Sequence, residues 1–147
     1  TDPSYTGQIL TMATSHIGNY GVHPTEIESD SMKIAGLITK KFSNGFSRAS
    51  ANDSLQNFME RDGVVGISDI DTRSLVRIIR EKGAQNCIIS SEILDEDKLK
   101  ELVAKVPSMD GLELASKVST KESYISGDDK ATFKVALLDM NTDCCIV

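Results

Sequence analysis

Ser4 is the first residue of this sequence whose type and position suit chemistry. It follows Asp2-Pro3 in the opening stretch TDPSYTGQIL. Asp-Pro pairs are typical of turns, because proline fixes the backbone and aspartate can bond to nearby backbone N–H groups. A serine in such a turn either bonds back to the local backbone or offers its hydroxyl to another molecule. The residues alone leave both interpretations of Ser4 open.

Cysteine and histidine are the residue types that a thiol hydrolase would use. A cysteine nucleophile needs a base beside it, but His16 and His23 lie in a turn-rich region and nothing places either near Cys87. We expect Cys87 to be a buried structural residue of a strand. Two histidines without a third ligand are also a weak metal signal. We therefore expect neither a catalytic residue nor a metal site in this chain.

A basic stripe is the other notable pattern. Arg73, Arg77 and Arg80 recur at i, i+4 and i+7 in DTRSLVRIIREKGA. This spacing places all three on one face of a helix. Such a stripe is either a solvated face or part of an interface, and the sequence leaves that choice open.

Composition excludes several classes of protein. Among 147 residues, 16 are Lys or Arg and 22 are Asp or Glu, so the net charge is −6. That charge disfavours binding to nucleic acid or to an anionic membrane surface. No apolar run approaches the ~20 residues of a membrane span. Three cysteines, two of them adjacent, make a poor disulfide framework, so we expect a reducing cytoplasm.

Hydrophobic periodicity predicts a mixed α/β domain, because strand-like and helical segments alternate along the chain. The predicted strands are Gln8–Ala13, Lys33–Phe42, Val64–Ile67 and Asn86–Ser90. The predicted helices are a short one capped by Asn52 or Asp53 and ended by Gly63, a second from Asp71 to Gly83, and a third from Asp95 to Val106. Their expected core residues are Leu55, Phe58 and Met59, then Leu75, Ile78 and Ile79, then Leu99, Leu102, Val103 and Val106.

The composition changes after Val118. Residues 119–132, STKESYISGDDKAT, are polar and nearly free of aliphatic side chains, so we interpret them as an interdomain linker. The following run FKVALL, Phe133–Leu138, is typical of a buried strand that begins a new parallel-sheet domain. The sequence therefore predicts one domain at 1–118, a linker at 119–132, and the start of an incomplete second domain at 133–147.

Five segments in the same order resemble a known family: TDPSYTGQI, HIGNYG, GISDIDTRSLVRIIREKGAQN, GLELASKVST and FKVALLD. They are similar to the small (glutaminase) subunit of glutamine-hydrolysing carbamoyl-phosphate synthetase. The resemblance covers the N-terminal domain, from Thr1 to about Thr120. It implies a three-layer β/β/α domain, followed by a class I amidotransferase domain whose first strand is the Phe133–Leu138 run.

The resemblance also implies a function. The whole subunit would hydrolyse glutamine through a cysteine thioester and pass ammonia to a large subunit. That large subunit would use ATP, Mg and bicarbonate to make carbamoyl phosphate for arginine and pyrimidine biosynthesis in the cytoplasm. The serine matching Ser4 would contact glutamine held by the next domain. Arg73, Arg77 and Arg80 would face the large subunit or the amidotransferase domain.

The chain also departs from the family pattern. The first strands that precede TDPSY in the family are absent, and residues are expected to be missing between Asn141 and Thr142. The G-x-C-x-G nucleophile motif and the downstream His-x-Glu are absent too, and Cys144 and Cys145 do not match them. We therefore expect a non-catalytic scaffold and subunit-contact fragment that needs no cofactor and is inactive alone. The alternative is a non-enzymatic interaction module that kept the fold.

Overall fold

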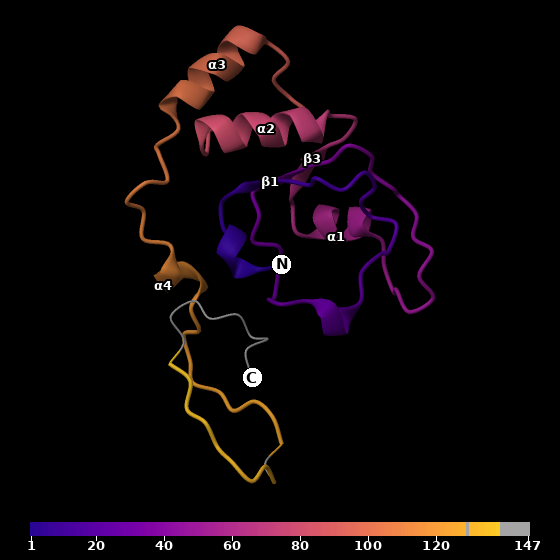
Figure 1. Cartoon of the computed structure of the whole chain (residues 1–147), viewed down its shortest axis with the longest axis vertical. Helices are drawn as coiled ribbons and strands as arrows, with labels where there is room; N and C mark the ends of the chain where they lie inside the picture. The colour runs from indigo at the N-terminus through magenta and orange to yellow at the C-terminus, as the bar shows by residue number, and fades with distance from the viewer. Residues whose placement is uncertain (129, 139–147) are drawn as a thin grey trace.

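The computed structural model of the chain describes residues 1–128 and 130–138 and shows a mixed α/β arrangement (Figure 1). This confirms the predicted fold class. The elements, in chain order, are η1 (Pro3–Tyr5), β1 (Ile9–Thr11), η2 (Pro24–Glu26), β2 (Gly36–Ile38), α1 (Leu55–Arg61), β3 (Val65–Ile67), α2 (Thr72–Lys82), α3 (Glu96–Lys105) and α4 (Ala115–Val118).

The three strands form one parallel sheet in the order β1-β2-β3. In the register, Leu37 of β2 lies opposite Leu10 of β1 and Gly66 of β3. Parallel neighbours need long connections, and α1 supplies one of them between β2 and β3. In the view of Figure 1, α1 lies below the strands and α2 lies above them.

The core lies between the sheet and α1. Leu37, Phe58 and Met59 are the buried apolar residues of the described chain, which confirms the predicted inward positions of the last two. A Cβ atom added to Gly66 would lie 3.0 Å from Met59 Cε, so the missing side chain makes room for the methionine. The N-cap of α1 is Ser54, whose side chain accepts the Asn57 N–H, so the prediction of Asn52 or Asp53 as the cap is wrong.

The longest helix forms as predicted. The side chain of Asp71 accepts the backbone N–H of Ser74 and so caps the first turn of α2. At the other end, Gly83 adopts a φ of 80° and its N–H bonds to the carbonyl of Ile79. Asp95 caps α3 in the same way, by accepting the N–H groups of the first turn.

Some predicted elements differ from the structure. The predicted strand Asn86–Ser90 does not form, because these residues pair with no strand of the described chain. Ile78 and Ile79 of α2 are exposed, as are Leu102 and Val106 in and just after α3, although all four were predicted to face the core. Periodicity correctly places them on apolar faces, but no element of the described chain covers them.

The segment after α4 extends away from the sheet and helices (Figure 1). Phe133 and Val135, in the segment predicted to begin a new domain, are 84% and 89% exposed. Within residues 133–138 the structure contains no strand. A parallel strand needs a neighbouring strand and cover on its faces, and the described chain offers this segment neither.

The loop that follows β1 closes tightly against residues 43–53. Gly21 has a φ of 72°, and its N–H donates to the carbonyl of Gly18 at 3.1 Å. A Cβ atom on Gly21 would lie 2.8 Å from atoms of Phe46, Ala51 and Asp53. Only glycine fits both this backbone conformation and this close approach.

We expect Gly21→Ala to lower the free energy of unfolding by about 1–3 kcal/mol, because it adds backbone strain and overlap with the Asp53 carbonyl oxygen and the side chains of Phe46 and Ala51. Gly45→Ala is the matched control, since its added methyl group meets nothing within 4 Å and its φ lies outside the left-handed range. Urea denaturation followed by circular dichroism measures both variants. Equal stability of the two variants would contradict the prediction.

Candidate functional site

The turn around Ser4 is held by its own side chains. Asp2 is the N-cap of η1, and its Oδ1 accepts the backbone N–H of Ser4 at 2.8 Å. Pro3 occupies the first helical position, where its missing N–H costs nothing. At the other end, the N–H and the hydroxyl of Thr6 both donate to the carbonyl of Pro3, at 3.0 and 2.6 Å. The predicted turn at Asp2-Pro3 is confirmed.

The turn is also attached to the sheet. The side chain of Gln8 donates to the carbonyl of Ser4 at 3.2 Å, so both backbone polar groups of Ser4 have side-chain partners. The N–H of Gly7 donates to the carbonyl of Lys33, and the N–H of Ala35 donates to the carbonyl of Gln8. These bonds extend the pairing of β1 with β2 up to the turn. The exposed side chain of Ser4 is therefore presented from a fixed backbone.

Asp2 is ionised over most of the pH range. Hydrogen bonding from the Ser4 hydroxyl, followed by that from the Ser4 N–H, lowers the pKa of the Asp2 carboxyl below its usual value. Both bonds favour the charged form, because a carboxylate accepts hydrogen bonds better than a carboxylic acid does. The turn thus holds a negative charge next to Ser4.

A hollow of about 570 Å³ lies beside the turn. Pro3 lines it on one side, residues 117–122 line it on another, and Ser29, Asp30 and Lys33 complete the wall. Asp30 and Lys33 are paired at 2.5 Å, and the pairing lowers the pKa of Asp30. Ser4 is next to Pro3 in the chain but is not among the lining residues. The hollow is polar and has charges of both signs, which suits a small zwitterionic molecule better than an apolar one.

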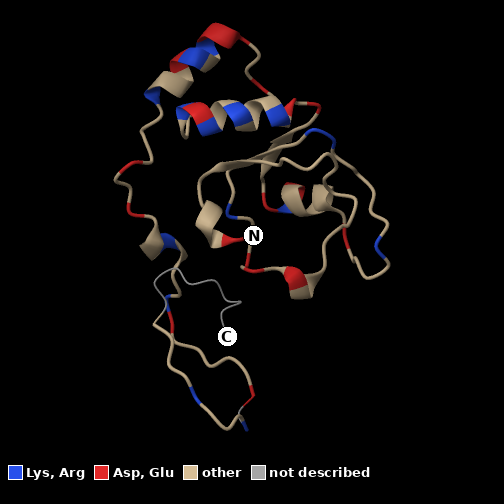
Figure 2. Ribbon diagram, in the orientation of Figure 1, with Lys and Arg blue, Asp and Glu red and all other residues tan. Residues whose placement is uncertain are grey.

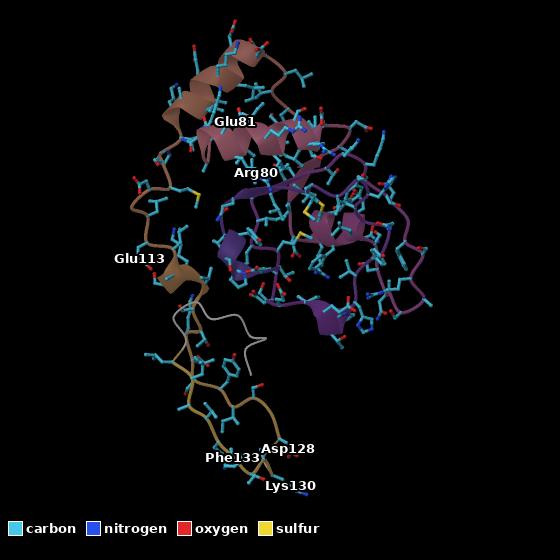
Figure 3. The ribbon with its side chains drawn as sticks, in the orientation of Figure 1. Arg80, Glu81, Glu113, Asp128, Lys130 and Phe133 are labelled. Carbon is cyan, nitrogen blue, oxygen red and sulfur yellow. The ribbon has the colours of Figure 1, made fainter. Side chains whose placement is uncertain are left out.

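The basic stripe lies on α2. All three of its arginines, Arg73, Arg77 and Arg80, are exposed. At about 100° per residue they fall within about 60° of one another around the helix axis. Figure 2 shows basic residues distributed along α2, and Figure 3 labels Arg80 and its neighbour Glu81. Among the described residues, no ion pair involves an arginine of the stripe.

The stripe and the turn remain separate features. Ser4 lies in η1 and the arginines lie in α2, and no hydrogen bond in the described part of the chain joins the two. The structure therefore does not bring the predicted positions into one site. They are two separate surfaces, one suited to a small polar ligand and one suited to an acidic partner.

Cys87 is an exposed residue outside any strand, so the prediction of a buried structural cysteine is wrong. Desolvation by its surroundings raises the pKa of its thiol. A raised pKa reduces the thiolate fraction at neutral pH, and the thiolate is the nucleophile.

His23 bonds to Thr25 within its own loop. Cys144 and Cys145 lie outside the described residues.

Within residues 1–128 and 130–138, no three His, Cys, Asp or Glu side chains gather closely enough to hold a metal ion. No helix of this described part has the length and apolar character needed to cross a membrane.

Sequence reasoning missed the partners that hold Ser4. The sequence identified Asp2 only as a turn residue. An N-cap aspartate followed by proline usually accepts a backbone N–H two or three residues on, so this pattern could have predicted its bond to the Ser4 N–H. Nothing in the sequence indicated that the Gln8 side chain bonds to the Ser4 carbonyl, because this bond depends on where that carbonyl points. The wall residues of the hollow come from segments far apart in sequence, so local patterns could not group them.

The loop that forms one wall of the hollow is tied to α1 through Asp62. Its Oδ2 accepts the backbone N–H of Met32 at 2.7 Å, and Arg61 pairs with Oδ1 at 3.0 Å. The Met32 bond is the largest cause of a lowered pKa at Asp62, and the Arg61 bond comes next. The position of Asp30 and Lys33 therefore depends partly on an ionised carboxylate in another element.

Comparison with known proteins identifies relatives of one kind. Residues 1–89 match the family described as "Carbamoyl-phosphate synthase small chain, CPSase domain". The carbamoyl phosphate synthase small chain of Chlorobaculum tepidum is 41% identical over 139 residues, which are 95% of this chain and 38% of that protein. The small chain of Thioalkalivibrio sulfidiphilus is 46% identical over 125 residues, 84% of this chain and 33% of that protein. The chain thus spans little more than a third of the length of these relatives.

We expect the hydrogen bond from the Met32 N–H to Asp62 to make the free energy of unfolding fall as the pH falls. Because the folded-state pKa of Asp62 is lowered, its contribution is present above the unfolded pKa of about 4 and is lost as pH falls through the folded value. Asp62→Ala should therefore lower stability at pH 7 and flatten the decline below pH ~4. Urea denaturation at a series of pH values measures this effect, with Asp110→Ala at an exposed position as the control. Parallel stability curves for wild type and Asp62→Ala would contradict it.

Proposed function

The chain belongs to the carbamoyl-phosphate synthase small-chain family, and from that premise we propose that the whole protein is the glutaminase subunit of a glutamine-hydrolysing carbamoyl-phosphate synthase. In this proposal the subunit hydrolyses glutamine and delivers ammonia to a large subunit. The complex is a ligase that uses ATP, Mg and bicarbonate to form carbamoyl phosphate for arginine and pyrimidine biosynthesis. We place it in the cytoplasm.

This chain supplies the scaffold of that subunit and not its nucleophile. Residues 1–118 form the N-terminal domain, residues 119–132 link it to the next domain, and residues 133–147 begin the amidotransferase domain. The described exposure of Phe133 and Val135 supports this division, because apolar side chains at an extended segment call for a covering domain. The raised pKa of Cys87 also argues against thiol catalysis in this part of the protein.

The observation that carries the proposal is the Ser4 turn. Glutamine presents an α-ammonium and an α-carboxylate group that need fixed polar partners. A short hydroxyl on a turn stiffened by Pro3 and bonded to the sheet supplies one such partner with little loss of entropy. In the proposed function, Ser4 reaches from this domain to glutamine bound by the following domain, where it orients the substrate without taking part in bond breaking.

The α2 stripe suits contact with the large subunit or with the amidotransferase domain. Its arginines are exposed and lack ion-pair partners within the described chain, on a protein with a net charge of −6. Arginine is also favoured at interfaces, because its planar head forms paired hydrogen bonds with carboxylates. On other faces of α2, the exposed Ile78 and Ile79 add apolar area that a partner could cover.

We expect Ser4→Ala in the full-length subunit to raise the KM for glutamine several-fold, since a neutral hydrogen bond contributes about 0.5–1.5 kcal/mol. Synthesis driven by added ammonia should be unchanged, because ammonia bypasses the glutamine site. Steady-state kinetics of the complex with each nitrogen donor measures both effects. Ser50→Ala, at another exposed serine, is the control. An unchanged KM would leave Ser4 as a turn residue only.

We expect Arg77→Glu to weaken association with the large subunit at least several-fold while leaving the thermal midpoint nearly unchanged, since exposed single charges contribute little to stability. Lys105→Glu, at the end of α3, makes the same charge change outside the stripe and serves as the control. Analytical ultracentrifugation at two salt concentrations measures the association. Equal behaviour of the two variants would return the stripe to the solvated surface.

A further inference from the structure

The loop between β2 and α1 carries Asn44-Gly45, the one place in the sequence where a glycine follows an asparagine. Both residues are exposed. We propose that Asn44 is a site of spontaneous covalent modification, where the Gly45 backbone nitrogen displaces the side-chain amide as ammonia, and that the isoaspartate product loosens the attachment of residues 17–22. This inference goes beyond the proposed function and does not depend on it.

The reaction needs no reagent other than water. The backbone nitrogen of Gly45 attacks the side-chain carbonyl carbon of Asn44 and forms a C–N bond. The amide nitrogen takes up the proton that the Gly45 nitrogen loses and leaves as ammonia, so a succinimide ring remains. Water then opens one of the two carbonyl–nitrogen bonds of the ring, which gives aspartate or isoaspartate. In isoaspartate the main chain runs through the side-chain carboxyl carbon, so the backbone is longer by a methylene group.

The structure leaves the reacting groups of this pair accessible. A Cβ atom added to Gly45 would meet nothing within 4 Å, so the space beside its nitrogen is open. Glycine also has no side chain to hinder the attack and can adopt backbone conformations that other residues rarely reach. Among the hydrogen bonds of the described chain, none uses the Gly45 N–H or the Asn44 side chain. The reaction therefore breaks no hydrogen bond at either group.

The other asparagines of the described chain lack this combination. Asn57 lies within α1, where its side chain donates to Asp53 at 2.7 Å. The side chain of Asn86 donates to the carbonyl of Val106 at 2.8 Å. Asn52 is followed by Asp53, whose side chain hinders attack by the nitrogen. Position 44 is therefore where we expect the reaction to be fastest.

Hydrogen bonds on either side of the pair attach this loop to residues 17–22. The N–H of Ser43 donates to the carbonyl of Ile17 at 2.8 Å, and the N–H of Ser47 donates to the carbonyl of Asn19 at 3.0 Å. A Cβ atom on Gly18 would lie 2.5 Å from the carbonyl oxygen of Ser43, so the two backbones are in close contact. A longer backbone between Ser43 and Ser47 changes the spacing of the two bonds, so we expect at least one of them to be lost.

The reaction also adds a negative charge at position 44. Asn44 lines a hollow of about 330 Å³ together with Gln56 and Glu60. The side chain of Gln56 donates to the Glu60 carboxylate at 2.6 Å. A second carboxylate facing this hollow is repelled by the first. Both products carry the new charge, but only isoaspartate lengthens the backbone, so Asn44→Asp separates the two effects.

The first test follows the full-length subunit during incubation at mildly alkaline pH by mass spectrometry of tryptic peptides. Trypsin releases residues 42–48, in which Asn44 is the only side-chain amide, and residues 49–61, which contain Asn52 and Asn57 as internal controls. Asn44 should convert at least about tenfold faster than either control, because only glycine leaves the attacking nitrogen uncovered. Peptide fragmentation should identify isoaspartate among the products. Equal rates at the three asparagines, or conversion to aspartate alone, would overturn the proposal.

Gly45→Ala is the variant that tests the ring closure. Its methyl group meets nothing within 4 Å, and the φ of Gly45 lies outside the left-handed range, so the fold should be kept. The added side chain hinders the attack and should slow the conversion of Asn44 at least about fivefold. Conversion as fast as in the wild type would overturn the attack by the Gly45 nitrogen.

The second test measures hydrogen–deuterium exchange in the full-length subunit before and after conversion, with Asn44→Asp as the matched control. In the isoaspartate form, a peptide covering residues 17–22 should exchange at least about threefold faster, because local opening becomes easier when anchoring bonds are lost. Asn44→Asp should stay within about twofold of the wild type, since an exposed single charge has little effect on stability. An isoaspartate form that exchanges like the wild type would overturn the loosening of residues 17–22. Equal acceleration in Asn44→Asp would overturn the role of the longer backbone.

Discussion

The parallel pairing of β1 with β2 is the constraint on which the rest of the described structure depends. Ile9 lies opposite Gly36, and the pairing continues beyond the strands through the Gly7 N–H and the carbonyl of Lys33. Because parallel strands cannot be joined by a tight turn, the chain between them must form a long loop, which carries η2 and the wall residues Ser29, Asp30 and Lys33 of the hollow. The same ladder fixes the end of η1, so a short exposed turn acquires the rigidity of a sheet.

This arrangement leaves much apolar surface open. The accessible surface is 11269 Å², whereas a compact monomer of 16.0 kDa exposes about 7,400 Å². Exposed apolar side chains of α2, α3 and the segment after α4 contribute to this excess. A domain that exposes so much apolar area gains stability when another domain or subunit covers it. This agrees with a chain that spans little more than a third of its relatives' length.

Sequence reasoning succeeded where local chemistry decides the structure. Asp71 and Gly83 limit α2 as their cap signals predict, and Asp2-Pro3 begins a turn. It failed where distant contacts decide. Residues Asn86–Ser90 have strand-like composition but no strand to pair with, and Ser54 caps α1 although two neighbouring residues were equally suitable caps. The bond from Gln8 to the Ser4 carbonyl joins residues four apart, but it depends on where that carbonyl points, which no sequence pattern indicates. The wall of the hollow depends on how remote segments meet.

The central claim is that the η1 turn, held by the sheet, forms one wall of a glutamine site in the full-length subunit. Hydrogen–deuterium exchange of the full-length protein, with and without saturating glutamine, tests it most directly when the expected downstream nucleophile is changed to serine to prevent turnover. Glutamine should slow exchange in a peptide covering residues 1–8 and leave exchange in the η2 segment Pro24–Glu26 unchanged. Protection confined to the downstream domain, with residues 1–8 exchanging at the same rate in both states, would contradict it.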